Sequence, residues 1–373
     1  MRVLHIVTHM NRGGLETMIM NYYRKMDKDK VQFDFLVHRE NRGDYDDEIE
    51  SLGGKIYRLP FLNPLSVTYR IALDSFFKNH STEYDIVHCH LDCMAGLPLK
   101  YAKKYNLSVR IAHAHNTSQE KNIKYAIKSF YKRLIPRYAT HLFACSNAAG
   151  KWMFESNTFE VMHNAIDSKE FEYNQYIRDD VRKELGFNDE EIVIGHIGRF
   201  DFQKNHTFLI NIFSEAFRIN SNTKLLLIGD GDLRAEIQDQ VRALGLVENV
   251  VFTGVRADIS RLLQAMDVFV FPSLFEGLPV TMVEAQASGL PCVISDKVPK
   301  ESVLVSDIVS IINLSDSPKY WAECVLDVSR KKRIGRANEI IENGFDIVAA
   351  SDWLEKKYSS MIVSNKGGYC VAE

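Results

Sequence analysis

Short apolar segments, rich in Val, Ile and Leu, alternate with longer amphipathic segments along most of the chain. In the first half, strands are expected at Val3–Thr8, Phe33–Val37, Lys55–Leu59, Asp85–His90, Arg110–Ala114 and His141–Ser146. Strands that are apolar on both sides need helices on both faces of their sheet. The alternation therefore predicts an α/β fold with a mostly parallel sheet.

A polar stretch at residues 167–191 interrupts this pattern, which then starts again. The second series of expected strands is Ile192–Ile197, Lys224–Ile228, Val250–Thr253, Val268–Pro272 and Pro291–Ser295. We therefore expect two Rossmann-like domains, at residues 1–166 and 192–346. They are joined by a linker at 167–191 that leads into a short helix. A helix is expected at 347–362 and a flexible tail at 365–373.

The composition fits this division and excludes several classes of protein. Hydrophobic residues make up 46% of the 373 residues and the net charge is −3, which argues against disorder and against general nucleic-acid binding. Lys and Arg outnumber Asp and Glu by 23 to 17 up to Ala165, whereas the remainder has 23 against 32. The six scattered cysteines indicate reduced thiols in the cytosol, and no segment reads as a signal peptide or a bilayer span.

Ligands of Rossmann-like domains bind at the carboxyl ends of the strands, so the loops at those ends are the candidate functional segments. The first such loop holds Gly13 and Gly14 before a helix, where paired glycines let a ligand approach the backbone and the helix start favours an anion. The loop lacks the Gly-x-Gly-x-x-Gly pattern of dinucleotide binding, which argues against an NAD-dependent oxidoreductase. A plain tight turn is the alternative.

Two cations follow the first strand of the second series. Arg199 ends that strand and Lys204 precedes the next helix, and a planar guanidinium beside a compact ammonium suits a diphosphate. A pair of solvated surface charges is the alternative interpretation.

Two glutamates, Glu276 and Glu284, bracket a later turn from strand to helix. Within that turn Gly277 permits exposed backbone amides, and Pro279 suits the first helical turn. Carboxylates accept strongly from hydroxyls, and an adjacent helix start can bind phosphate. Hydroxyls beside phosphate describe a nucleotide sugar, and a structural capping arrangement is the alternative.

Together these motifs resemble the retaining glycosyltransferases of family 4, especially the bacterial members that build capsule or exopolysaccharide. The resemblance covers about residues 1–362, and its most specific element is the glutamate pair within FEGLPVTMVEA. It implies the GT-B fold, in which two Rossmann-like domains face each other across a cleft and the C-terminal helix returns to the N-terminal domain. Ala165 stands where the family usually has glycine, a departure that concerns the hinge turn.

The resemblance also implies a role for each candidate residue. Arg199 and Lys204 hold the donor diphosphate, Glu284 binds the ribose, Glu276 orients the sugar hydroxyls and His115 lies beside the donor sugar. The other implied donor-binding residues are Gly13, Gly14, Gly229, Gly231, Thr253, Gly254, Gly277, Leu278, Pro279, Val280 and Thr281. No cofactor and no metal are implied, because side chains replace the cation that other transferases use.

The run from His88 to Cys93 raises the alternative of a zinc site. His88 and His90 share one strand face, whereas Cys89 points the other way and Cys93 lies beyond the strand. No second ligand cluster has a matching spacing. A strand end that lines the acceptor side of the cleft is therefore the favoured interpretation.

Residues 119–138 carry six cations against one acid, with apolar residues at helical spacing. Such a basic amphipathic helix is typical of docking on an anionic membrane surface, which a lipid-linked acceptor would require. An ordinary packed helix with a solvated face is the alternative.

The sequence thus predicts a retaining hexosyltransferase at the inner face of the plasma membrane. Its donor is a nucleotide sugar, expected to be a UDP-sugar, and its acceptor a lipid-linked saccharide or an oligosaccharide. A nucleotide-sugar epimerase of the same fold and a non-catalytic nucleotide-sugar-binding subunit are the alternatives. The complete set of Arg199, Lys204, Glu276 and Glu284 argues against a degenerate subunit.

Overall fold

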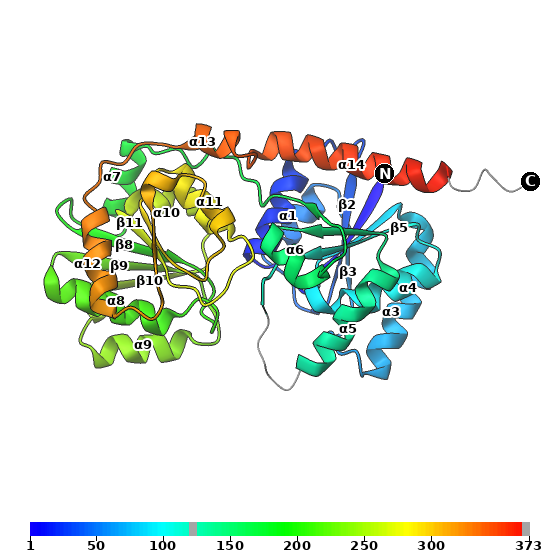
Figure 1. Cartoon of the computed structure of the whole chain (residues 1–373), viewed down its shortest axis with the longest axis horizontal. Coiled ribbons are helices and arrows are strands. Elements are labelled where there is room, and N and C mark those ends of the chain that lie inside the picture. Colours follow the sequence, from blue (N-terminus) through cyan, green and yellow to red (C-terminus); the bar gives the residue numbers. More distant parts are fainter. Residues whose placement is uncertain (119–124, 368–373) are drawn as a thin grey trace, which may run out of the picture. The chain divides into compact units, whose positions relative to one another are not determined.

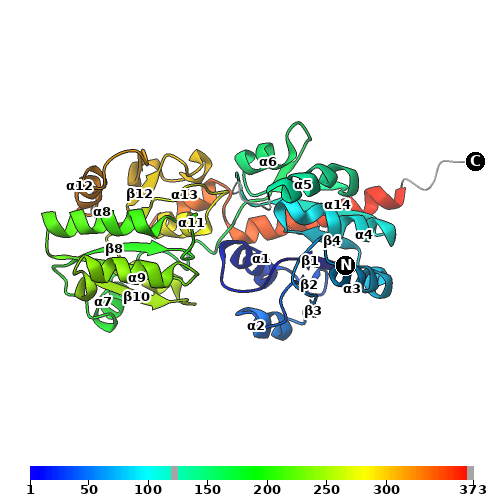
Figure 2. The ribbon, with the colours of Figure 1, turned by 90° about the horizontal axis from the view of Figure 1, so that it is seen from below.

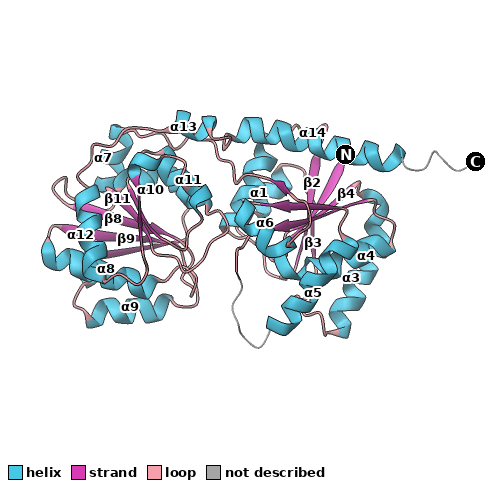
Figure 3. Ribbon diagram, viewed as in Figure 1, coloured by secondary structure: helices cyan, strands magenta, loops and turns pink. Residues whose placement is uncertain are grey.

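The computed structural model describes residues 1–118 and 125–367 and divides into two compact units (Figure 1). Unit 1 comprises Met1–Asn164 and Ile347–Glu373, and unit 2 comprises Ala165–Asp346. Each unit is built around one parallel sheet with helices against it (Figure 3). The tail expected at 365–373 lies outside the described residues from position 368 onward.

The sheet of unit 1 has seven strands in the order β3-β2-β1-β4-β5-β6-β7. These strands are β1 (Arg2–Ile6), β2 (Gln32–Val37), β3 (Ile56–Arg58), β4 (Ile86–Cys89), β5 (Val109–Ala114), β6 (His141–Ala144) and β7 (Glu160–Val161). The first six match expected strands to within two residues at each end, because both faces of the sheet are covered and most residues of the strands are apolar. The chain order reverses at β1, whose neighbours are β2 and β4.

Six helices of unit 1 follow its strands along the chain. They are α1 (Gly14–Lys25), α2 (Asp46–Ser51), α3 (Val67–His80), α4 (Gly96–Lys104), α5 (Tyr125–Tyr138) and α6 (Asn147–Phe154). Helices α3, α4 and α5 pack side by side on the face of the sheet opposite α1 (Figure 1). The first six residues of the basic helix expected at 119–138 lie outside the described part of the chain.

The last helix, α14 (Ile347–Gly367), completes unit 1 and packs against α1. Its Leu354 and Tyr358 are fully buried, and the Tyr358 hydroxyl lies 2.7 Å from Nδ1 of His88 on β4. The expectation that the C-terminal helix returns to the N-terminal domain is thus confirmed. Among the described residues, no helix is both long enough and apolar enough to cross a bilayer.

The sheet of unit 2 has six strands in the order β10-β9-β8-β11-β12-β13. They are β8 (Ile192–Ile197), β9 (Thr223–Ile228), β10 (Val250–Gly254), β11 (Val268–Phe271), β12 (Cys292–Ser295) and β13 (Val309–Ile312). The helices are α7 (Gln175–Glu184), α8 (His206–Ile219), α9 (Arg234–Ala243), α10 (Ile259–Ala265), α11 (Val280–Ala287), α12 (Pro318–Val328) and α13 (Ala337–Glu342). Helices α8, α9 and α12 cover one face of the sheet (Figure 2), and a single apolar core joins them to it.

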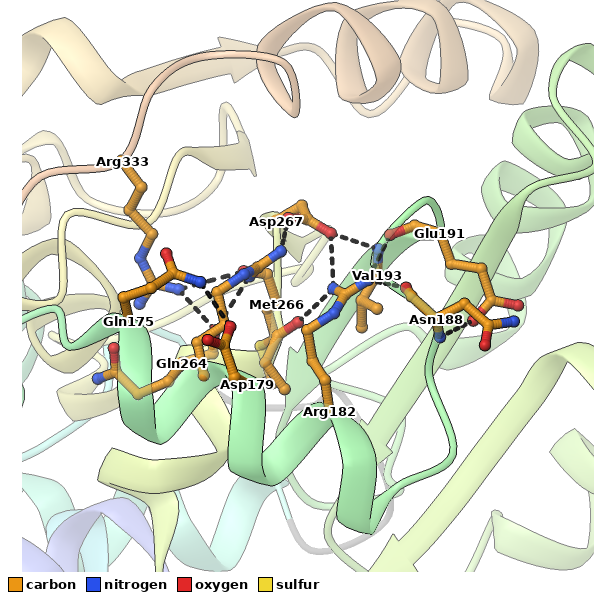
Figure 4. A network of polar contacts seen from close by, with 12 residues as sticks. Gln175, Asp179, Arg182, Asn188, Glu191, Val193, Gln264, Met266, Asp267 and Arg333 are labelled. Atoms are coloured by element: carbon orange, nitrogen blue, oxygen red, sulfur yellow. Dashed lines mark hydrogen bonds and ion pairs between the residues drawn. The ribbon is translucent and has the colours of Figure 1, made fainter.

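The stretch 167–191, expected as a linker, lies within unit 2 and contains α7, which packs against α10. Its Arg182 is almost fully buried and donates to the carbonyl of Ala265 at 3.0 Å and to Asp267 Oδ2 at 3.2 Å. The same carboxylate accepts from the backbone N–H of Val193 at 2.7 Å (Figure 4). Arg333 donates to the carbonyls that end α10. A buried network thus fastens α7 to the sheet.

Candidate active site

The chain order of the unit 2 sheet reverses at β8, which lies between β9 and β11. In open α/β sheets the ligand site lies at such a reversal, outside the carboxyl ends of the strands. Arg199 and Lys204 follow β8, and Glu276 follows β11. The topology therefore brings together at one edge three residues that are far apart in sequence.

Lys204 and Glu276 form an ion pair at this edge, with Nζ 2.6 Å from Oε1. The Lys204 ammonium also lies 4.6 Å from the centre of the Phe271 ring, and its backbone N–H donates to Asp201. Both side chains are largely buried, with 16% and 6% of their surfaces exposed. A cation held this way is positioned in advance for a phosphate, which can take the place of the carboxylate.

Arg199 differs from Lys204 in that its side chain is paired with no other described residue. Its side chain is exposed, and among the described residues nothing forms a hydrogen bond or an ion pair with its guanidinium. The five N–H donors of this planar group are therefore available to an anionic ligand beside Lys204.

Glu284 lies on α11 with only 5% of its surface exposed. Within the described part of the chain its carboxylate has neither a hydrogen bond nor an ion pair, although buried polar groups are nearly always paired. Burial, together with the charge of Glu170, raises the pKa of Glu284 to about 8. Glu284 is thus a buried acid that has no side-chain partner among the described residues, on the helix that follows the Glu276 loop.

The loop before α11 is mostly buried. Gly277, Leu278 and Val280 are buried, and Thr281 is half-buried. Pro279 is the N-cap of α11 rather than a residue of its first turn, one position earlier than expected. The start of an eight-residue helix, with its free N–H groups, therefore lies between the two glutamates.

The two remaining glycine loops support the strand end that carries Arg199. Gly229 has a φ of +134°, and a Cβ there would collide with the carbonyl oxygen of Gly198. A Cβ on Gly231 would lie 2.5 Å from the carbonyl oxygen of Phe200. Glycine is therefore needed at both positions for the β9 loop to pack under the β8 loop.

Thr253 and Gly254 lie at the end of β10, one strand further from the reversal. The N–H of Gly229 donates to the Gly254 carbonyl at 2.9 Å, which joins the β9 and β10 loops. The Thr253 hydroxyl donates to carbonyls of its own sheet, at 3.1 Å to Gly254 and 3.4 Å to Leu227. The contacts of these two residues thus connect neighbouring loops and strands of unit 2. The Thr253 hydroxyl is used in these internal hydrogen bonds, so its contacts give no sign of a ligand-binding role.

Gly13, Gly14 and His115 belong to unit 1, at the carboxyl edge of its own sheet. Gly13 is the N-cap of α1 and Gly14 its first residue, and apart from its neighbours along the helix no atom of the described part of the chain lies within 4 Å of a Cβ placed on Gly14. The Glu16 side chain approaches Gly13 closely. The start of α1 is thus open to solvent at Gly14 and partly covered by a carboxylate at Gly13.

His115 follows β5 and is held from two sides. Its backbone N–H donates to Asp92 Oδ1 at 2.8 Å, and its Nε2 lies 3.0 Å from Nδ1 of His90. Burial lowers the pKa of His115 to about 3, so the ring is neutral at pH 7. Asp92, which has a φ of +45°, also accepts from Asn116 at 2.7 Å. Asp92 is not among the site residues predicted from the sequence, although a carboxylate three residues beyond a buried strand was a signal for it.

Two consecutive parts of the chain match known protein families. "Glycosyltransferase Family 4" matches residues 12–170, and "Glycosyl transferases group 1" matches residues 177–346. The protein EpsF of Bacillus subtilis (strain 168), whose name assigns it to the glycosyltransferases, is 37% identical over 92% of this chain and 93% of its own length. The chain belongs to glycosyltransferase family 4.

Further relatives of this glycosyltransferase carry more specific names. The capsular polysaccharide biosynthesis glycosyltransferase CapH of Staphylococcus aureus is 27% identical over 96% of this chain and 99% of its own length. The Escherichia coli UDP-Gal:alpha-D-GlcNAc-diphosphoundecaprenol alpha-1,3-galactosyltransferase is 28% identical over 79% of this chain and 80% of its own.

Among solved structures, Anabaena HepE in complex with UDP and glucose aligns with a TM-score of 0.80 over 96% of this chain and all of its own, at 18% identity. At that identity the likeness shows the fold, and the expected GT-B class is confirmed.

Proposed function

We propose that this glycosyltransferase transfers a hexose, with retention of configuration, from a UDP-sugar to a lipid-linked saccharide in capsule or exopolysaccharide synthesis. The observation that carries the proposal is the edge of the unit 2 sheet. There the loop after β8 carries the Arg199 guanidinium and Lys204, which pairs with Glu276 of the loop after β11, and α11 carries the buried Glu284 carboxylate. Among the described residues, neither Arg199 nor Glu284 has a side-chain partner. The names of CapH, the E. coli galactosyltransferase and the HepE complex support the donor and acceptor classes.

Each side chain at this edge has a role that follows from its chemistry. Arg199 and Lys204 bind the diphosphate of the donor and stabilise the negative charge that grows on it as it leaves. Glu284 accepts from the ribose hydroxyls, and the N–H groups at the start of α11 meet phosphate or sugar oxygens. His115 of unit 1 is assigned to the donor sugar, with Gly13 and Gly14 as the backbone that approaches the donor.

The Lys204–Glu276 ion pair suggests how the donor enters. Without donor, each group neutralises the other at 2.6 Å. A diphosphate that binds Lys204 releases Glu276, which then accepts from the hydroxyls of the sugar. The acceptor hydroxyl attacks the anomeric carbon on the face from which the diphosphate leaves, and a departing phosphate oxygen takes its proton. No carboxylate has to act as a nucleophile.

A donor panel tests the proposed reaction. The purified protein is incubated with UDP-, GDP- and ADP-sugars, with and without a short lipid-diphosphate-linked saccharide, and nucleotide release is followed. We expect UDP to be released from UDP-sugars, and the acceptor to accelerate that release. By NMR, the new glycosidic bond should have the same anomeric configuration, axial or equatorial, as the donor. A free epimerised sugar nucleotide would indicate the epimerase, and no turnover with any donor would indicate a binding subunit.

Chelation is expected to leave the transfer rate largely unchanged. Arg199 and Lys204 provide the positive charge that a divalent cation provides in other transferases, so the leaving diphosphate needs no metal. Initial rates are measured after dialysis against EDTA and after adding back Mg²⁺ or Mn²⁺. A complete loss of activity that either ion restores would contradict this assignment of the two cations.

The proposal that the protein binds a membrane surface is based on helix α5 of unit 1. Arg133 and Arg137 are exposed on it, and Phe130 exposes 59% of its surface. Lys132 is different, because its ammonium donates to the Trp152 carbonyl at 2.6 Å and packs over the Trp152 ring. The helix thus carries exposed cations beside an exposed aromatic ring, a combination suited to an anionic bilayer surface.

Vesicle binding tests this surface. The protein is expected to sediment with vesicles that contain anionic lipid and to detach as salt rises, because salt screens charges over ~10 Å at 0.1 M. The double change R133E/R137E is expected to reduce binding at least tenfold, since each cation near the surface adds ~1 kcal/mol. The matched control, K183E/K319E on the surface of unit 2, keeps binding. If the wild type ignores anionic vesicles even at low salt, α5 is an ordinary solvated helix.

A further inference from the structure

Five histidine side chains lie together on one face of the unit 1 sheet, and the proposed reaction uses only His115. His5 lies on β1, His88 and His113 lie on β4 and β5, and His90 follows β4. Alternate residues of a strand share a face, and the parallel register places His5 beside His88. Neighbouring ring centres are 4.1–5.3 Å apart.

The imidazoles form two hydrogen-bonded chains. In the first, His5 Nδ1 lies 2.9 Å from His90 Nε2, and His90 Nδ1 lies 3.0 Å from His115 Nε2. In the second, the Tyr358 hydroxyl lies 2.7 Å from His88 Nδ1, and His88 Nε2 lies 3.1 Å from His113 Nδ1. This leaves Nε2 of His113 buried and, among the described residues, without a hydrogen-bond partner.

We propose that His90, His113 and His115 bind a divalent transition metal ion, with zinc favoured, and that the ion withdraws His115 from sugar transfer. One nitrogen from each of these rings lies within 4.8 Å of the other two. Zinc bonds to imidazole at ~2.0–2.1 Å, so two ligands of a tetrahedral ion are about 3.4 Å apart. The 3.0 Å between His90 and His115 has to open only slightly to admit the ion.

The remaining histidines can orient these ligands. When His90 binds through Nδ1, its proton is on Nε2 and is donated to His5. When His113 binds through its unpartnered Nε2, its proton is on Nδ1 and is donated to His88. Such contacts fix the tautomer and the ring orientation of a metal-binding histidine. A ligand set made only of imidazoles suits Zn²⁺, Cu²⁺ and Ni²⁺ rather than Mg²⁺ or Ca²⁺.

Accessibility separates this trio from the other possible one. His5, His88 and His90 are all buried, whereas His115 is half-exposed at the end of β5. An ion can therefore enter beside His115, with its fourth position open to water or an added ligand. The inhibitory effect rests on the proposed role of His115 at the donor sugar, but the metal site itself does not.

Cobalt titration of the whole protein tests the site directly. We expect one equivalent of Co²⁺ to give the visible absorption of a tetrahedral ion, which Zn²⁺ then removes by displacement. His115→Asn and His113→Gln are expected to weaken binding at least tenfold. The control His38→Gln, which removes a buried imidazole elsewhere in unit 1, is expected to bind cobalt as tightly as the wild type.

Far-UV circular dichroism at the same temperature shows whether each variant is folded. If folded His115→Asn binds cobalt as tightly as the wild type, the proposed site is wrong. This outcome is decisive even if His113→Gln does not fold.

Transfer rates test the second half of the proposal. Each protein is compared with its own metal-free rate, and Zn²⁺ at the concentration that saturates the cobalt site is expected to inhibit the wild type severalfold. His113→Gln is expected to lose that inhibition. Stoichiometric binding without any inhibition would overturn the assigned role of His115 while leaving the metal site established.

Discussion

Replacing Lys204 by alanine is expected to lower kcat/KM by two orders of magnitude or more. The ammonium lies in a largely buried position 2.6 Å from Glu276, where water screens charge poorly. Losing one group that stabilises a developing negative charge in such a site typically raises the barrier by ~3 kcal/mol. The change also removes the Lys204 ammonium from beside the buried Glu276 carboxylate, so a donor diphosphate meets a more negative site.

Arg199→Ala is expected to act in the same direction, since its guanidinium is the second cation at this edge. Lys224→Ala is the matched control, because Lys224 lies near the start of β9 and donates to the Glu248 carbonyl at 3.0 Å. Initial rates over a range of donor concentrations separate kcat from KM. Near-normal turnover in both Lys204→Ala and Arg199→Ala would show that the diphosphate binds elsewhere.

Glu284→Gln is expected to stabilise the fold at alkaline pH while weakening donor binding. The pKa of Glu284 rises from 4.5 to about 8 in the folded chain. The folded state therefore binds the proton more tightly than the unfolded state. The contribution of Glu284 to the free energy of unfolding is greatest below pH 4.5. It falls by about 1.4 kcal/mol per pH unit until pH 8, roughly 5 kcal/mol in all. Glutamine has the shape of the neutral acid and no charge to desolvate.

Urea unfolding at pH 5 and pH 8 measures this difference. The variant and the wild type should differ little at pH 5, and the variant should be more stable by several kcal/mol at pH 8. The surface change Glu236→Gln serves as the control and should show no such divergence. A stability gap that is the same at both pH values would mean that burial does not penalise the Glu284 carboxylate. The expected loss of donor affinity at pH 8 is checked by calorimetry.

Much of the fold could be predicted from the sequence because both sheets are covered on both sides. Each strand is then a short apolar run, and the following loop is a candidate site. Gly229 and Arg199 were found in this way, from loops alone. The contact between Lys204 and Glu276 depends on β8 and β11 being neighbours, which no local pattern contains.

Other features could not be predicted because they depend on contacts between strands or on the burial of residues that are usually exposed. The histidines of the cluster come from β1, β4 and β5 and the segments that follow β4 and β5. Their positions therefore show no regular ligand spacing along the sequence near His88. Arg182 is buried beside Asp267, whereas arginine is almost always exposed unless it is paired. The polar stretch that contains it was therefore interpreted as a linker leading into a short helix. The helix is present as α7, but its packing against α10 within unit 2 was not predicted.

The return of α14 to unit 1 determines the order in which the protein can be completed during synthesis. Unit 2 is one continuous segment, so all of its strands are available once Asp346 has left the ribosome. Unit 1 begins earlier but lacks α14, and the surface that receives the buried Leu354 and Tyr358 stays uncovered until then. The nascent chain therefore carries unit 1 without α14, with this apolar surface uncovered, for the whole time that unit 2 is being made.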